Sequence, residues 1–154
     1  MSYTPVSPVP VRVLLFKNDP LDALHVRLAI DLSPMWCEIQ VLGEDLETVG
    51  LLRASIRAGS VAPEMILFDA DLSDPQCTTL LGAVRDSKEL GGLPLVVIGD
   101  ADSPECPALA RSHGATAFVR RPVRSADLVG VGREIARIWS DHETRRSAAL
   151  ASLS

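Results

Sequence analysis

The feature that most constrains the fold is a regular alternation of short, unbroken apolar runs with segments of helical periodicity. The apolar runs occupy residues 11–16, 35–42, 63–69, 93–100 and 116–119. Runs of this kind, apolar at successive positions, are typical of parallel strands that are covered on both faces. Five such strands joined by helices predict an α/β fold, with one five-stranded parallel sheet that is doubly wound and has helices on both faces.

The helices between these strands are expected from their apolar spacing and their end signals. In the first, from Pro20 to about Asp31, Leu21, Leu24, Leu28 and either Val26 or Leu32 should face the sheet. Asp45 is expected to cap the second, and Gly59 to end it. Others are expected at 75–90 and 104–112. Ser125 should cap the last, in which Leu128, Val131, Ile135 and Ile138 face inward.

A chain of 154 residues is the right length for one domain. We place that domain at 11–139, after a disordered proline-rich arm at 1–10. The last helical pattern continues to about residue 150, although covering one edge of the sheet needs only about 15 residues, or ~22 Å. Residues 140–154 are therefore interpreted as a helical extension or a linker. A projecting stalk, a frayed tail and a signalling linker all fit, and the linker is preferred.

Composition and charge argue against several classes of function. Residues 120–146 carry seven arginines and four acids, but the rest of the chain is acidic and the net charge is −5. Arginines interleaved with acids are typical of a solvated helix face, so we expect no direct nucleic-acid binding. Three widely spaced cysteines suggest neither a disulfide framework nor a zinc site. No apolar stretch approaches the ~20 residues of a membrane span, and a cytoplasmic location is expected.

Polar residues, and one glycine, stand at the ends of several predicted strands. In open α/β sheets, ligands bind at the carboxyl ends of the strands, so these residues are candidates for a shared site. They are Lys17, Asn18 and Asp19 after the first strand, Asp69 and Asp71 at the third, Gly99 and Asp100 at the fourth, and Arg120 and Arg121 after the fifth.

The chain resembles the receiver domain of bacterial-type response regulators, which act in two-component signalling and phosphorelays. The resemblance rests on "VLLFKNDP", "PEMILFDADLSD", "LPLVVIGD" and "GATAFVRRPV", in that order, and covers about residues 11–139. It implies a flavodoxin-like sheet with strand order 2-1-3-4-5. It also implies that Asp69 is the phospho-acceptor for a histidine kinase or a small phosphoryl donor, with Asp71 supplying a backbone carbonyl to a divalent cation.

The sequence departs from the receiver pattern around this acceptor. Lys17 and Asn18 stand where the family has two metal-binding acids, and Gly99 stands where it has a switch hydroxyl. Arg121 replaces the family's lysine, whereas Phe118 keeps the aromatic switch position. Since Mg²⁺ prefers hard oxygen ligands and little nearby positive charge, we expect weak or absent Mg²⁺ binding and no other cofactor. Any metal site would have to use Asp19, Asp69 and Asp71.

Lys17 has two possible roles. Its ammonium could replace the metal ion by pairing with Asp69 or Asp19. Alternatively, it could point to solvent beside a pocket that has lost its function. Both leave Asp69 as a retained acceptor that is idle.

Three functions remain open from the sequence. The preferred one is a non-enzymatic pseudo-receiver, a protein–protein interaction module that works without phosphorylation. Its fourth helix, fifth strand and last helix would contact another signalling protein, a fused output domain or a second copy, with a homodimer formed through the last helix and fifth strand. The alternative is a receiver phosphorylated on Asp69 by a histidine kinase. A small-molecule-binding flavodoxin-like protein is disfavoured, because "KNDPLD" is no phosphate loop.

Overall fold

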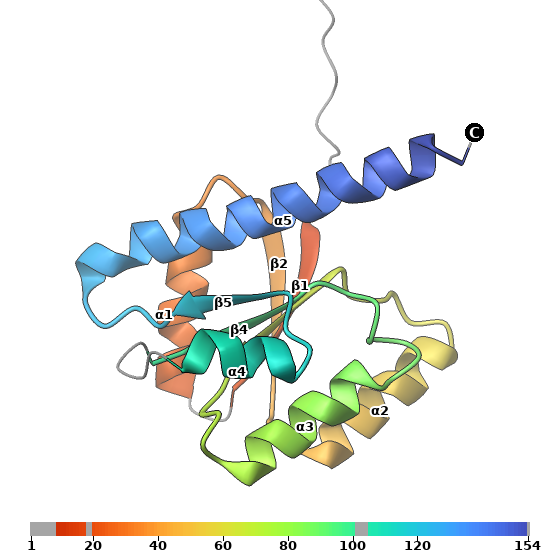
Figure 1. Ribbon diagram of the computed structural model, residues 1–154, viewed down its shortest axis with the longest axis horizontal. Coiled ribbons are helices and arrows are strands. Elements are labelled where there is room, and N and C mark those ends of the chain that lie inside the picture. Colours follow the sequence, from red (N-terminus) through yellow and green to blue (C-terminus); the bar gives the residue numbers. More distant parts are fainter. Residues whose placement is uncertain (1–8, 18–19, 101–104, 154) are drawn as a thin grey trace, which may run out of the picture.

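The computed structural model describes residues 9–17, 20–100 and 105–153 and shows a three-layer α/β domain (Figure 1). The predicted residues Asn18 and Asp19 and most of the predicted arm lie outside the described residues. In chain order the elements are β1 (Val11–Phe16), α1 (Pro20–Asp31), β2 (Cys37–Leu42), α2 (Leu46–Arg57), β3 (Met65–Asp69), α3 (Pro75–Arg85), β4 (Leu95–Gly99), α4 (Cys106–Ser112), β5 (Ala117–Arg120), the 3₁₀ helix η1 (Ser125–Asp127) and α5 (Leu128–Ala151).

The five strands form one parallel sheet in the order β2-β1-β3-β4-β5, which confirms the predicted topology. Alternate residues of the central strands enter two separate cores, because successive side chains of a strand point to opposite faces. Leu14 and Phe16 pack with the helices α2, α3 and α4. Val13 and Leu15 pack with α1 and α5 on the other face. All five residues of β3 and of β4 are buried, as their unbroken apolar sequence predicts.

The prediction for the inner face of α1 is wrong for its leucines, whereas Val26, one of the two alternatives, is buried. Ala23, Val26, Ala29 and Ile30 pack against the sheet and α5, whereas Leu21, Leu24, Leu28 and Leu32 are 40 to 69% exposed. Small residues occupy the inner face of α1 because α5 packs very close to it. A Cβ added to Gly132 of α5 would lie 2.0 Å from the carbonyl oxygen of Ala29. Leucines at that crossing would hold the two helices apart.

Local signals fix the ends of most helices. The Asp45 carboxylate accepts a hydrogen bond of 2.6 Å from the Thr48 amide and caps α2, as predicted. Gly59 follows that helix with φ +106°, a conformation that favours glycine. Ser125 does not cap the last helix. It begins η1, and the Asp127 carboxylate instead accepts from the amides of Val123 and Arg124.

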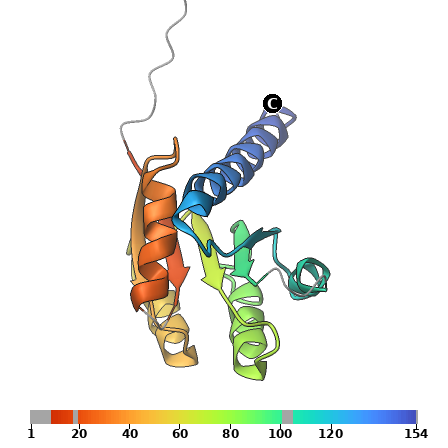
Figure 2. The ribbon, with the colours of Figure 1, turned by 90° about the vertical axis from the view of Figure 1, so that its left-hand side faces the viewer.

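The last helix is continuous from Leu128 to Ala151, and its outer turns project past the sheet (Figure 2). Val131, Ile135 and Ile138 are buried, and Leu128 is half-buried, in agreement with the predicted inner face. Within the described part of the chain, no helix is both long enough and apolar enough to cross a membrane.

Candidate functional site

Asp69 lies at the centre of the candidate site, as the last residue of β3. Its side chain is fully buried, because β3 is the middle strand and is covered by helices on both faces. Its Oδ1 atom is contacted by two cationic side chains, Lys17 and Arg121. Its Oδ2 atom is buried and has no hydrogen-bond partner among the described residues. Among the described residues, the carboxylate is therefore held through Oδ1 alone.

Arg121 provides the stronger of the two contacts. It directly follows β5, and its backbone amide donates to the carbonyl of Gly99 at 2.9 Å, which fixes the start of the side chain. Its Nε donates to Asp69 Oδ1 at 3.0 Å, and its Nη2 donates to the same oxygen. Its Nη1 donates to Asp100 Oδ1 at 2.7 Å. The planar guanidinium thus joins two carboxylates from neighbouring strands.

The charges around Arg121 favour its protonated form. Burial alone lowers the pKa of Arg121, but the hydrogen bonds and charge of Asp69, together with those of Asp100, outweigh burial and raise the pKa above its ordinary value. Arg121 is therefore a permanent cation beside Asp69.

Lys17 directly follows β1, the strand next to β3, and its Nζ atom lies 3.5 Å from Asp69 Oδ1. Its backbone amide donates to the carbonyl of Leu42 at 2.9 Å, so its position is tied to the sheet. The Lys17 side chain is 14% exposed and faces the carboxylate, not solvent. The structure thus shows the ion pair with Asp69, one of the two predicted pairings of Lys17.

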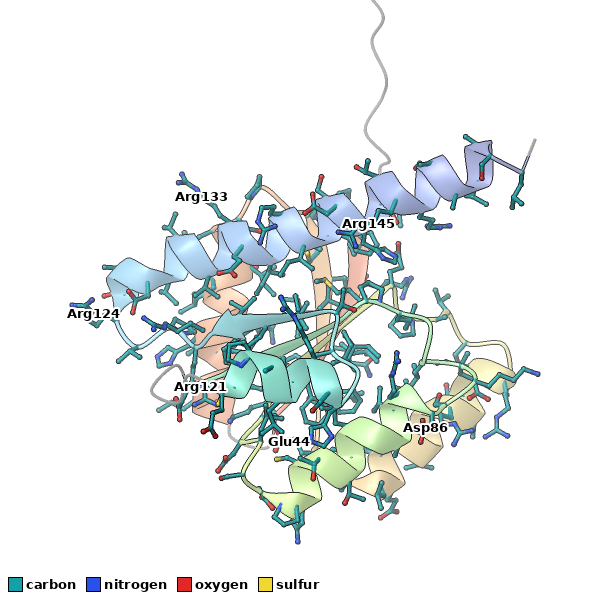
Figure 3. The ribbon with its side chains drawn as sticks, viewed as in Figure 1. Glu44, Asp86, Arg121, Arg124, Arg133 and Arg145 are labelled. Atoms are coloured by element: carbon teal, nitrogen blue, oxygen red, sulfur yellow. The ribbon has the colours of Figure 1, made fainter. Side chains whose placement is uncertain are left out.

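Two acids of this site did not receive a role from the sequence. Asp100 accepts from Arg121, and Glu44, two residues beyond β2, lies at the same end of the molecule (Figure 3). Burial raises the pKa of Glu44, and the charge of Lys17 opposes that rise whereas the charge of Asp69 adds to it. A signal for Glu44 existed in its position just after a predicted strand, since β2 is the neighbour of β1.

Asp71 is not drawn into the site through its side chain. It is exposed, and its Oδ1 accepts from the amide of Ser73 at 3.0 Å and from the Ser73 hydroxyl at 2.6 Å. These hydrogen bonds lower the pKa of Asp71. Its carboxylate thus closes a local turn.

Gly99 and Phe118 are in contact across β4 and β5. A Cβ added to Gly99 would lie 3.0 Å from Phe118 Cε2 and 3.3 Å from the backbone carbonyl oxygen of Ala70. Phe118 is half-buried and packs against the core that includes α4. The ring therefore occupies the space that a side chain at position 99 would need.

The described residues around Asp69 do not fit a divalent cation. Mg²⁺ binds oxygen ligands and disfavours adjacent positive charge. Here an ammonium and a guanidinium both contact Asp69 Oδ1, so a cation bound to this carboxylate would lie beside two positive charges. Across the described residues, no group of three histidine, cysteine or acidic side chains is arranged to hold a metal.

Comparisons with solved structures identify this architecture. The chain superposes on the Mn²⁺-bound response regulator Rcp1 with TM-score 0.65 and 18% identity, covering 84% of this chain and 94% of that one. It superposes on the phosphorylated cyanobacterial phytochrome response regulator RcpA with TM-score 0.68 and 15% identity, covering 85% and 94%. The chain has the fold of response-regulator receiver domains.

A third structure with the receiver fold belongs to a longer protein. NtrX from Brucella abortus matches with TM-score 0.62 and 18% identity over 92% of this chain but only 29% of its own. No protein-family model matches the chain, and no curated protein matches it. The fold is therefore identified by structure, at identities of 15 to 18%.

Proposed function

We propose that this chain is a signal-transduction module with the receiver fold that works through protein contacts without phosphorylation. The single observation that carries the proposal is the double ion pair on Asp69 Oδ1, made by Lys17 at 3.5 Å and by Arg121. Two fixed cations neutralise the carboxylate in the absence of a metal ion. Lys17 takes the place of the metal, and Asp69 is a structural anion.

Burial of Asp69 supports the same proposal. Its side chain is fully buried, and Oδ2 is enclosed as well. Attack on a phosphoryl group requires the nucleophilic oxygen and the phosphorus atom to come within about 3–3.5 Å of each other. A donor could reach Oδ2 only after this atom had become exposed. Transfer between two anionic reactants would also lack the charge compensation that a metal supplies.

The contact between Gly99 and Phe118 supports a module that does not switch. Position 99 has no hydroxyl that could move toward a phosphoryl group, and the Phe118 ring already fills the adjacent space. We propose that this edge of the sheet keeps one arrangement and presents a constant surface to partners.

The exposed leucines of α1 support a role in protein contacts. Leu21, Leu24, Leu28 and Leu32 form a stripe on the outer side of the helix. Exposed apolar patches of this kind mark interaction sites more often than isolated apolar residues do. The proposed partners are another signalling protein, a fused output domain or a second copy of the chain. The share of β5 in a homodimer, expected from the sequence, remains a prediction.

Phosphorylation of Asp69 by a histidine kinase is the second candidate function. One observation favours it: Asp69 Oδ2 has no hydrogen-bond partner among the described residues and is chemically available once exposed. The two candidates differ in whether a phosphoryl group reaches Asp69, so one experiment separates them.

That experiment is acid-quenched intact mass spectrometry after incubation with acetyl phosphate and Mg²⁺. We expect no mass increment for the wild-type chain, because Lys17 and Arg121 hold Asp69 and exclude the metal. A variant with Lys17→Asp and Asn18→Asp restores two acids and is expected to gain one phosphoryl group, lost again on Asp69→Asn. A wild-type increment that Asp69→Asn abolishes would contradict the proposal and establish a working acceptor.

A further inference from the structure

Beyond Ser140, α5 has no residue that is buried by the described part of the chain. The buried residues of α5 are Val131, Gly132, Ile135 and Ile138, and every described residue from Ser140 onward is exposed or half-buried. The helix nevertheless continues to Ala151 (Figures 1 and 2). A helical segment of about 12 residues with little packing is only marginally stable in water, and a partner packed along this one would stabilise it.

One side of this projecting half carries an ordered pattern of side chains. Positions spaced alternately by three and four residues lie in one stripe along a helix. The stripe, here called the α5 seam, consists of Ala136, Trp139, Glu143, Arg146 and Leu150 on the helix, together with Leu153 in the turn that follows it. It is apolar at both ends and charged in the middle, where Arg146 Nη1 and Glu143 Oε1 are 3.2 Å apart. Leu150 is 59% exposed and Leu153 is 82% exposed.

The inner end of the seam opens into an apolar cleft, here called the tryptophan cleft. The cleft has a volume of about 340 Å³ and is lined by Val9, Val11, Pro34, Met35, Trp36, Ala136, Trp139 and Ser140. Both tryptophans of the chain are in this lining. Trp36 is 60% exposed, and Trp139 is half-buried, with its ring centroid 5.8 Å from that of His142.

The α5 seam is complementary to itself when two copies run antiparallel. A two-fold axis between positions 144 and 145 places Trp139 opposite Leu150 of the second copy. The same axis places Glu143 opposite Arg146, and Ala136 opposite Leu153, each time in both directions. Trp139 lines the cleft and Leu150 lies opposite it in this pairing, so Leu150 of each copy is placed at the cleft of the other. The apolar outer end of each seam therefore lies at the tryptophan cleft of the other copy, and Glu143 and Arg146 each face the opposite charge.

From this complementarity we propose that a second copy of the chain binds antiparallel along the α5 seam, and that Leu150 of each copy fills the tryptophan cleft of the other. The proposal deepens the proposed function by naming the partner of the last helix and the register of the contact. This contact does not use the share of β5 expected from the sequence, because the cleft is built from α5 and from residues at or just before the beginning of β1 and β2.

A parallel pairing of the same helices is disfavoured by charge. It would set Glu143 against Glu143 and Arg146 against Arg146 of the second copy, and like charges in direct apposition across an interface are costly. The antiparallel pairing is isologous, so one self-complementary contact is used twice and the assembly closes at two copies.

The test is sedimentation velocity over a dilution series of the 154-residue chain, read together with tryptophan emission. We expect a dimer whose dissociation exposes Trp36 and Trp139 to water and shifts their emission to the red. Leu150→Asp is expected to weaken the dimer at least about tenfold, since it places a charge in an apolar cleft. Leu51→Asp, at a position that is 66% exposed on α2, is the matched control and should leave the dimer unchanged.

Charge reversal tests the register. Glu143→Arg and Arg146→Glu should each weaken self-association, because each sets like charges against one another. A mixture of the two variants should recover a heterodimer, in which two arginines face two glutamates. The pair of opposite charges within each helix is lost in both variants, so recovery reports contact between chains.

A wild-type chain that remains a monomer at its highest soluble concentration would overturn the proposal, as would a dimer equally tight in Leu150→Asp. Single charge reversals without effect on the dimer would overturn the register. None of these results changes the expected outcome for Asp69 phosphorylation, so failure of the dimer and failure of the proposed function remain distinguishable.

Discussion

Replacing Arg121 by methionine removes the stronger cation from Asp69 while keeping much of the alkyl chain. The substitution deletes two hydrogen bonds to a carboxylate whose side chain is fully buried. Removing one partner of a buried ion pair costs about 3–5 kcal/mol, because the remaining charge is left without compensation. Lys17 stays 3.5 Å from Asp69, and Arg121 is 23% exposed, so we expect the lower end of this range. The predicted loss in unfolding free energy is about 3 kcal/mol.

A double-mutant cycle with Asp69→Asn isolates the electrostatic part of that loss. The amide is neutral, so Arg121→Met should cost only about 1 kcal/mol in the Asp69→Asn background, which leaves a coupling energy of about 2 kcal/mol. The assay is urea unfolding at pH 7, followed by far-UV circular dichroism at one fixed protein concentration, since self-association would otherwise change the apparent stability. An equal cost of Arg121→Met in both backgrounds would refute the view that Arg121 compensates a buried Asp69 charge.

Two further substitutions test the rim of the site. Gly99→Ala should destabilise the chain by about 1–3 kcal/mol, because the new Cβ would meet Phe118 at 3.0 Å and the Ala70 carbonyl at 3.3 Å. In a Phe118→Ala background, Gly99→Ala should lower the unfolding free energy by less, as measured by urea unfolding. An equal loss in both backgrounds would argue against the contact with the ring. The raised pKa of Glu44 means that folding favours its protonated form, so its contribution to stability is present at low pH and lost as the pH rises through the folded pKa. Glu44→Gln should therefore be more stable than wild type at pH 7 and equally stable below about pH 4, whereas exposed Glu38→Gln should follow the wild type. Parallel stability curves for wild type and Glu44→Gln would contradict this prediction.

The sequence was sufficient to predict the sheet. The runs that became β3 and β4 are apolar at nearly every position, which is typical of central parallel strands that are buried on both faces. The Asp45 cap and the inner face of α5 were equally readable, because each depends on residues a few positions apart. The inner face of α1 could not be predicted from the local sequence. Its small residues are needed because Gly132, about 100 residues away along the chain, packs closely against Ala29.

The site divides in the same way. The sequence by itself determined that Asp69, Lys17 and Arg121 would stand at the carboxyl ends of three strands, because apolar runs fix strands and strand ends fix the residues that follow them. Only the tertiary structure decided that both cations contact the same oxygen of Asp69, that Asp100 and Glu44 join them, and that Phe118 covers Gly99. Those interactions involve residues in or after different strands of the sheet, and the distances between them are set by strand register and helix packing. Neither the strand register nor the helix packing can be obtained from the order of residues along the chain.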